Sequence, residues 1–152
     1  MLDFFSVLKT ESEFRFDFLV NVTAVDWMDA HPERFEVVYH LMSVPLRWRL
    51  RVKIEVPEQK PEVDSLCGLW NSANFMEREA WDMLGITFKG HPDVRRILMY
   101  DEFVGHPLRK DYPVQAKQPR VRLLNPEVRN TAVDMQRPAL VKINQRQGSS
   151  AR

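Results

Sequence analysis

An eleven-residue stretch of strict alternation, from Leu46 to Val56, constrains the fold of this chain more than any other feature. Every even position in it is apolar and every odd position is charged. Successive side chains point to opposite faces of a strand, whereas a helix returns to the same face after about 3.6 residues. The stretch therefore predicts a β-strand with one face in the core and the other in solvent.

The segment just before it, residues 35–42, is predicted to be the partner strand of an antiparallel hairpin. Its odd positions are apolar, and a proline between the two segments favours a four-residue turn. Such a turn would pair Met42 with Arg47 and, further along, Glu36 with Lys53. It also keeps the alternating apolar side chains on one face of the sheet.

Two helices are predicted to cover that face. In residues 73–84 the apolar side chains recur at helical spacing, Ser72 is placed to cap the start, and Gly85 stands where a left-handed residue ends a helix. Residues 65–71 are predicted to form a shorter helix. The charged side chains of the longer helix are expected on its other sides, facing solvent or a partner: Glu77, Arg78, Glu79 and Asp82. Arg78 and Asp82 stand four residues apart, the spacing of an ion pair.

Shorter elements complete the predicted fold. Residues 2–10 form an amphipathic helix that turns Leu2, Phe5 and Leu8 to one side, with Phe4 beside them. Residues 19–25 form a strand, and residues 86–88 and 97–100 are candidate short strands. The expected fold class is α+β, with two layers, a mainly antiparallel sheet and helices on one face.

Charge and aromatic content divide the chain into a body and a tail. Residues 1–113 hold 14 basic and 19 acidic residues, whereas residues 114–152 hold eight basic and two acidic ones. No aromatic residue follows Tyr112. We therefore expect one folded domain, residues 1–113, and an extended basic tail, residues 114–152. Apolar runs are too short for a membrane span, and a single cysteine excludes an internal disulfide.

Gly-His-Pro occurs twice, at residues 90–92 and 105–107, within a stretch in which 13 of the 37 residues from 77 to 113 are charged. Such loops cannot build a core, and their backbone groups need hydrogen-bond partners. We expect these partners to lie in another protein.

Other chemistry finds less support in the residues. His91, His106, Asp93 and Asp101 could surround a metal ion, but no two of them have the local spacing typical of zinc ligands. Two carboxylates only two positions apart on a helix, Glu77 and Glu79, point away from each other and cannot act as an acid–base pair. The arginine-rich strand and the basic tail could bind nucleic acid, yet the body is acidic and the tail lacks aromatic residues that stack on bases.

The charged stretch resembles one family closely. Glu77-Arg78-Glu79, Asp82-Met83-Leu84, His91, Arg95 and Ile97-Leu98 stand at the spacing of the C subunit of respiratory complex I, the 30 kDa subunit family of NADH:quinone oxidoreductase. Gly105-His-Pro-Leu-Arg-Lys-Asp-Tyr-Pro113 resembles the closing motif of that family at every position. Weaker similarity reaches upstream through residues 16–26 and 35–41, so that it covers about residues 1–113. Many members carry a further segment before the first helix.

The resemblance implies a scaffold subunit with no catalytic residues, metal or cofactor of its own. Flavin mononucleotide, iron–sulfur clusters, NADH and quinone would belong to other subunits. The chain would pack on the D subunit of complex I in a hetero-oligomer and rigidify the quinone site, on the cytoplasmic side of the bacterial inner membrane or the equivalent matrix or stromal side. The expected partner-facing or motif residues are Glu77, Arg78, Glu79, Asp82, Gly90, His91, Pro92, Arg95, Arg96, Gly105, His106, Pro107, Leu108, Arg109, Lys110, Asp111, Tyr112 and Pro113.

Alternatives remain at this point. Membrane-bound hydrogenases and ferredoxin-driven complexes contain an equivalent subunit, and the sequence does not separate them from complex I. A stand-alone metal hydrolase built on His91 and His106 is a further alternative. The five arginines, lysines and acids implied as partner-facing could instead lock the loops internally by pairing with Glu77, Glu79 and Asp82: Arg95, Arg96, Arg109, Lys110 and Asp111.

Overall fold

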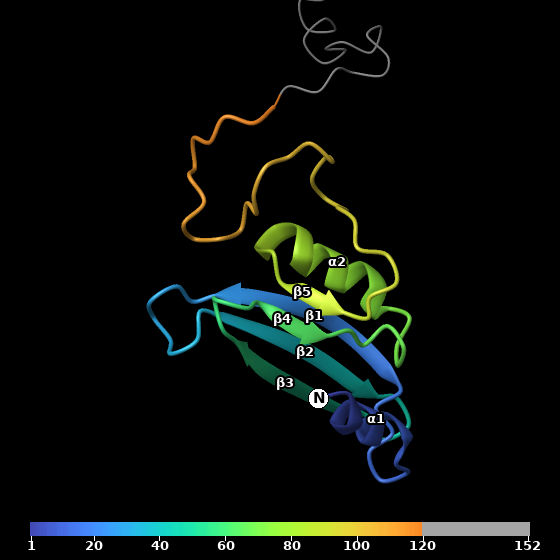
Figure 1. Cartoon of the computed structure of the whole chain (residues 1–152). Helices are drawn as coiled ribbons and strands as arrows, with labels where there is room; N and C mark the ends of the chain where they lie inside the picture. Colours follow the sequence, from blue (N-terminus) through green and yellow to red (C-terminus); the bar gives the residue numbers. More distant parts are fainter. Residues whose placement is uncertain (120–152) are drawn as a thin grey trace, which may run out of the picture. The chain divides into compact units, whose positions relative to one another are not determined.

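A computed structural model describes residues 1–119, and most of the predicted tail, residues 120–152, lies outside the described residues. The elements formed by residues 1–119 are shown in Figure 1: α1 (Leu2–Thr10), β1 (Phe18–Asp26), β2 (Phe35–Ser43), β3 (Trp48–Val56), β4 (Glu62–Asp64), α2 (Ala73–Leu84) and β5 (Thr87–Lys89). None of the helices in this part of the chain has the length and apolarity needed to cross a bilayer. The predicted α+β class is confirmed.

The main sheet is antiparallel and has the order β1-β2-β3. The predicted alternation holds, because the odd positions of β2 and the even positions of β3 face the core. The predicted register is wrong by two residues: Met42 pairs with Arg49, and Glu36 pairs with Glu55. The loop spans residues 44–47, and Arg47 adopts a left-handed conformation with φ of 57°. A shift of two residues preserves which face each side chain occupies.

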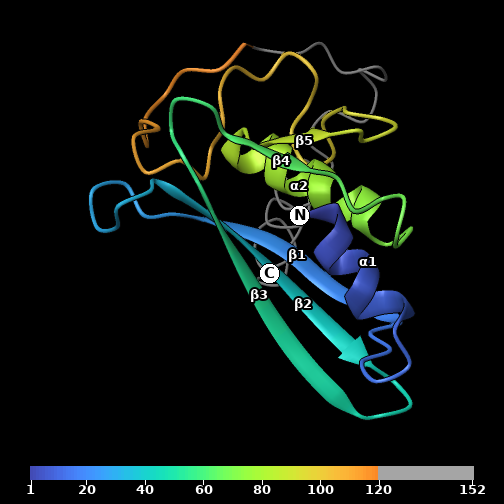
Figure 2. The same cartoon turned by 60° about the horizontal axis from the view of Figure 1, so that its bottom comes forward.

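Both helices lie on one face of this sheet, and their apolar side chains form one core with it (Figure 2). Phe5 of α1 packs against Tyr39 of β2, with ring centroids 5.0 Å apart, while α2 contacts β1. The predicted side of α1 is partly right: Phe5 and Leu8 are buried, but Leu2 and Phe4 are exposed. The sheet therefore has one covered face and one open face.

Three local predictions are wrong. Residues 65–71 form turns and not a helix, and residues 97–100 form bends and not a strand. Ser72 stands at the start of α2, but its hydroxyl bonds the carbonyl of Leu19 and does not cap the helix. The expected strand at 86–88 is present as β5, which pairs in parallel with β4, an element without a clear sequence signal.

Candidate functional site

The last turn of α2 ends in a set of carbonyls that the helix itself leaves without partners. Gly85 N–H donates to the carbonyl of Trp81. The next three carbonyls are bonded by the closing motif: Asp82 O by the ring of His106, Met83 O by the amide of Leu108, and Leu84 O by Nε of Arg109 at 2.6 Å. We call residues 105–113 the closing segment. Its first half is the C-terminal cap of α2.

Gly85 makes this cap possible. It has a left-handed conformation with φ of 75°, and a Cβ placed on it would lie 2.5 Å from Nη2 of Arg109 and 2.6 Å from the ring of His106. A side chain here would collide with both capping residues. The predicted left-handed end of the helix is confirmed, and the closing segment explains why it must be glycine.

Asp82 is the charged centre of the site and is fully buried. Its Oδ2 accepts hydrogen bonds from three successive amides, those of residues 97–99, at 2.9–3.0 Å. Its Oδ1 accepts from Arg96. Burial alone raises the pKa of the Asp82 carboxyl, but the amides and the guanidinium outweigh burial and hold this pKa below its usual value.

Arg96 connects the two loops that follow α2. Besides Asp82, its guanidinium donates to the carbonyls of Phe103 and Gly105 at 2.8 and 3.1 Å. It also lies over the rings of Trp81 and Phe103. The loop after β5 is thus tied to α2 along its length, and Figure 1 shows this segment passing over the helix.

Glu77 is also buried, although we expected it on a solvated or partner-facing side. Its carboxylate accepts from the hydroxyl of Ser65 at 2.6 Å and from the amide of Leu66 at 2.7 Å. Burial raises the pKa of Glu77, and these two donors oppose the rise only in part. This carboxylate orders residues 65–67, which is why they turn and do not continue as a helix.

Arg78 has another role than the one expected from its spacing. It does not pair with Asp82, which Arg96 occupies. Its guanidinium donates to the carbonyls of Arg95 and Arg96 at 3.2 and 3.1 Å, and it lies over the ring of Phe75. Arg78 is therefore a buried support for the backbone of the loop.

The second half of the closing segment binds the end of β1. The amide of Lys110 donates to Asp26, and Asp111 pairs with Arg34 at 2.9 Å. Arg34 also bonds both oxygens of Asp26 at 3.1 Å and contacts Glu58. Burial raises the pKa of Asp26, but Arg34 and the amides of Lys110 and Met28 lower it by more, so that this pKa lies below its usual value.

The predicted interface residues divide by exposure. Those that are buried or half-buried are Glu77, Arg78, Asp82, His91, Arg96, Gly105, His106, Pro107, Arg109 and Tyr112. Those that are exposed are Glu79, Gly90, Pro92, Arg95, Leu108, Lys110, Asp111 and Pro113. Most charged groups of the motif that bear on α2 therefore act inside this chain. The structure brings Asp82, Arg96, His106 and Arg109 together, while Glu79 and Lys110 lie apart from them in solvent.

The same loops expose large apolar side chains that the sequence analysis did not single out. We call them the loop surface: Phe75, Val94, Leu98, Val104 and Leu108, with exposed fractions between 46% and 66%. Phe75 stands off the apolar stripe of α2, a signal that the sequence contains. A hollow of about 360 Å³ lies beside Phe75 and Arg95.

Among residues 1–119, one group of side chains could hold a metal ion: Cys67, Glu77 and His91, whose ligand atoms lie within 4.8 Å of one another. His106, Asp93 and Asp101 do not belong to this group. Each nitrogen of His91 already has a partner, Nε2 the carbonyl of Asn74 and Nδ1 the amide of Asp93. A metal would have to replace these bonds and those of Glu77.

Comparison with known proteins agrees with this architecture. Residues 1–118 match the family model described as respiratory-chain NADH dehydrogenase, 30 Kd subunit. The chain is 56% identical over 110 residues to the C subunit of the NADH-quinone oxidoreductase of Citrifermentans bemidjiense, covering 72% of this chain and 68% of that protein. It is 53% identical over 105 residues to the C subunit of Geotalea uraniireducens, covering 69% and 63%.

A relative that matches over a longer stretch is the second of the numbered C subunits of Rhizobium etli, which is 47% identical over 126 residues, or 83% of this chain and 65% of that protein. A solved structure, the trypsin-resistant fragment (1–134) of Nqo5, superimposes with a TM-score of 0.54 at 38% identity. That match covers 60% of this chain and 76% of the fragment. The matches thus span about two thirds of the length of these curated relatives.

Proposed function

This chain belongs to the family of the 30 kDa subunit of respiratory-chain NADH dehydrogenase, and we propose that it is a scaffold subunit of an NADH-quinone oxidoreductase. In this proposal it has no catalytic residues and holds no flavin, iron–sulfur cluster, metal, NADH or quinone itself. It packs on the D subunit in the peripheral arm, on the cytoplasmic side of a bacterial inner membrane or the equivalent matrix or stromal side. The relatives reported above carry the name of this oxidoreductase.

The loop surface supports packing on a partner. It presents large apolar side chains that are about half to two thirds exposed, on loops without helix or strand after β5. Exposed apolar side chains that gather on one surface mark interaction sites. The bonds of Asp82 and Arg96 hold these loops in place before any partner arrives, which lowers the entropy that binding would cost.

A rigid support is the role that this geometry performs best. The motif charges fix the loops to α2, and the closing segment fixes α2 to β1. A partner bound to the loop surface would therefore be held against the main sheet. In an electron-transfer enzyme such a support keeps the distances between redox groups and the shape of the quinone cavity constant.

The test is co-purification of a tagged chain with a co-expressed homologue of the D subunit. We expect Leu98→Glu and Leu108→Glu each to reduce recovery of this partner about tenfold, because a charge is placed in an apolar contact. The thermal melting temperature should stay unchanged, since both side chains are exposed. Val7→Glu, at an exposed apolar position of α1, is the control. Wild-type recovery with both variants would show that the loop surface is not the interface.

A further inference from the structure

The open face of the main sheet carries an apolar hollow that the proposed packing of the loop surface does not use. Helices α1 and α2 cover the other face (Figure 2), and no helix or strand within residues 1–119 packs over this one. A hollow of about 450 Å³ lies near the start of β1. We call its outward-facing lining the sheet groove: Phe18, Val20, His40, Met42, Arg49 and Arg51.

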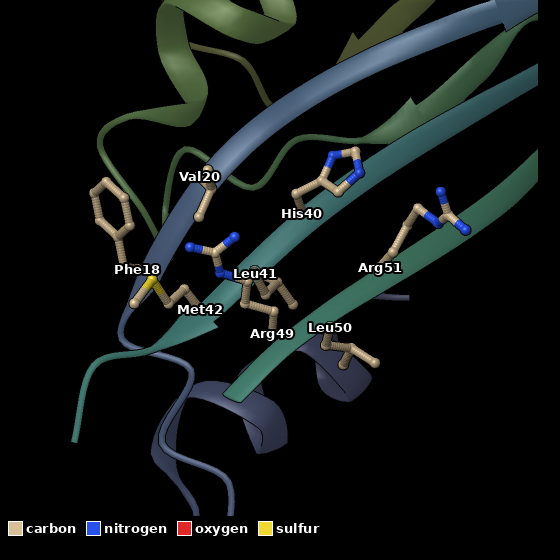
Figure 3. A pocket seen from close by; sticks show the side chains of 8 residues that line it. All are labelled: Phe18, Val20, His40, Leu41, Met42, Arg49, Leu50 and Arg51. Atoms are coloured by element: carbon tan, nitrogen blue, oxygen red, sulfur yellow. The ribbon is translucent and has the colours of Figure 1, made fainter. Parts of the chain in front are cut away.

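A β-bulge builds the apolar part of the groove. The pairing of β1 with β2 skips one residue between Leu19 and Asn21, so Val20 is the extra residue. Bulges re-aim side chains, and Val20 here lines the groove with Phe18 and Met42 (Figure 3). Phe18 and Val20 are 49% and 42% exposed. Burying these side chains under a partner would therefore be favourable.

The groove is bordered by two arginines without counter-charges. At the far end of β3 the charges are paired, Lys53 with Glu36 at 2.9 Å and His31 with Glu55 at 3.8 Å. None of the ion pairs formed within residues 1–119 includes Arg49 or Arg51. Figure 3 shows Arg49 reaching over Met42. The groove therefore offers positive charge beside an apolar floor.

His40 adds an unsatisfied polar group to the same surface. Its Nδ1 is shielded from solvent, and no residue in the described part of the chain bonds it. Its ring stands between the apolar end of the groove and Arg51 (Figure 3). A shielded nitrogen without a partner is costly unless a bound molecule supplies a donor or acceptor.

We propose that the sheet groove binds a segment of another polypeptide in which acidic residues flank apolar ones. The segment places its apolar side chains against Phe18, Val20 and Met42 and its carboxylates against Arg49 and Arg51. This inference rests on the proposed assembly into a complex, but it assigns a second contact on the opposite face of the sheet.

Charge excludes two other occupants. The chain's own residues 114–152 hold eight basic and two acidic residues, so Arg49 and Arg51 would repel them. A second copy meeting this one face to face would oppose the same arginines to each other. A polyanion such as nucleic acid would meet Glu36 and Glu55 on the same face and would leave the apolar floor without a matching surface.

The experiment is photo-crosslinking in the assembled complex, followed by mass spectrometry. A benzoylphenylalanine replaces Val20 in one variant and Leu108, on the loop surface, in another. We expect the Val20 variant to crosslink to one peptide of another subunit, rich in Asp or Glu beside apolar residues. Crosslinks to residues 120–152, to a second copy or to lipid, or no crosslink at all, would overturn the proposal.

Charge reversal supplies the second measurement. Arg49→Glu combined with Arg51→Glu should abolish the Val20 crosslink or weaken it by roughly tenfold. Lys60→Glu, the same reversal at an exposed position whose counter-ion is Glu62, should leave it unchanged. The Leu108 variant separates the two proposals: if it crosslinks to a partner while the Val20 variant does not, only the groove proposal fails. If neither crosslinks and the chain does not co-purify, the assembly itself fails.

Discussion

Two buried carboxylates, Glu77 and Asp82, stand five residues apart on α2, and their surroundings move their pKa values in opposite directions. Both lose solvent, which favours the neutral acid. Asp82 gains three amides and a guanidinium in return, so its charged form is stabilised. Glu77 gains a hydroxyl and one amide, which do not compensate for burial. One residue is therefore a structural anion, and the other is closer to a neutral hydrogen-bond partner.

This contrast predicts unequal costs for removing the two charges. Asp82→Asn should lower the free energy of unfolding by about 3 kcal/mol, because Arg96 is left without its anion and the amide group cannot accept all four donors. Glu77→Gln should cost less than about 1 kcal/mol, because a side-chain amide can still bond Ser65 and Leu66. Urea unfolding at neutral pH measures both values, and equal losses would contradict the assignment.

The pH dependence provides an internal control for the same pair. A carboxyl whose folded-state pKa is lowered stabilises the fold above its unfolded pKa, and this contribution disappears as the pH falls through the folded value. The difference between wild type and Asp82→Asn should therefore shrink below about pH 4. Glu77 acts with the opposite sign, since stability is lost as pH rises through its raised pKa. Glu77→Gln should remove that loss.

At the scale of elements, α2 depends on the closing segment for its C-terminal end. Three of its last carbonyls are bonded by His106, Leu108 and Arg109. In turn, the closing segment has no strand or helix of its own within the described residues and is ordered by those bonds. The helix and the segment are thus one cooperative unit, and Gly85 is the place where they meet.

Substitutions of three glycines by alanine separate backbone strain from collision at this junction. Gly68→Ala should be nearly neutral, because a methyl group there would meet no atom within 4 Å and its φ is not positive. Gly90→Ala should cost about 1 kcal/mol for its φ of 79° alone, since the space is open. Gly85→Ala should cost more, about 3 kcal/mol, because the methyl group also displaces Arg109 and His106. Thermal unfolding gives the order, and equal values for Gly85 and Gly90 would refute the cap.

The elements that sequence patterns could identify are those set by local periodicity. Residues 73–84 are predicted with their limits, since an apolar stripe and a terminal glycine both lie in the segment. The alternation of β3 predicts its faces but not its register, which depends on Arg47 entering a left-handed conformation in the loop. Residues 65–71 have helical spacing, yet Glu77 captures their amide and hydroxyl from another element.

The candidate site shows the same division between local and distant information. The motif residues can be found because their spacing is specific, but the roles predicted for them are partly wrong. Asp82 and Glu77 look like surface charges on a helix, and only the loop that returns over α2 buries them. The loop surface has no sequence signature, because isolated apolar residues in a charged segment give no periodic signal.

At the scale of the whole molecule, residues 114–119 extend the described body beyond the closing segment. Gln118 exchanges two hydrogen bonds with the backbone of Val104, both at 2.9 Å, and Tyr100 bonds the carbonyl of Pro119. Every core residue precedes them in the sequence. The proposed division into a domain of residues 1–113 and a basic tail can therefore be tested by truncation.

A chain that ends after Pro119 should melt at the temperature of the full chain, because no described core contact is removed. A chain that ends after Pro113 should melt a few degrees lower, since the loop around Val104 loses two hydrogen bonds worth about 1 kcal/mol each. Circular dichroism during heating measures both. Unfolding of the longer truncation at room temperature would show that residues 120–152 belong to the cooperative body.

The cap of α2 also bears on the order in which the protein is made. The acceptor carbonyls of Asp82 and Leu84 are separated from their donors in His106 and Arg109 by 24 and 25 residues. While those donors are still inside the ribosome, the helix emerges with an open end and with Asp82 not yet enclosed. The body can reach its final stability only when the closing segment has left the exit tunnel, so synthesis and completion of this fold are coupled at its very last motif.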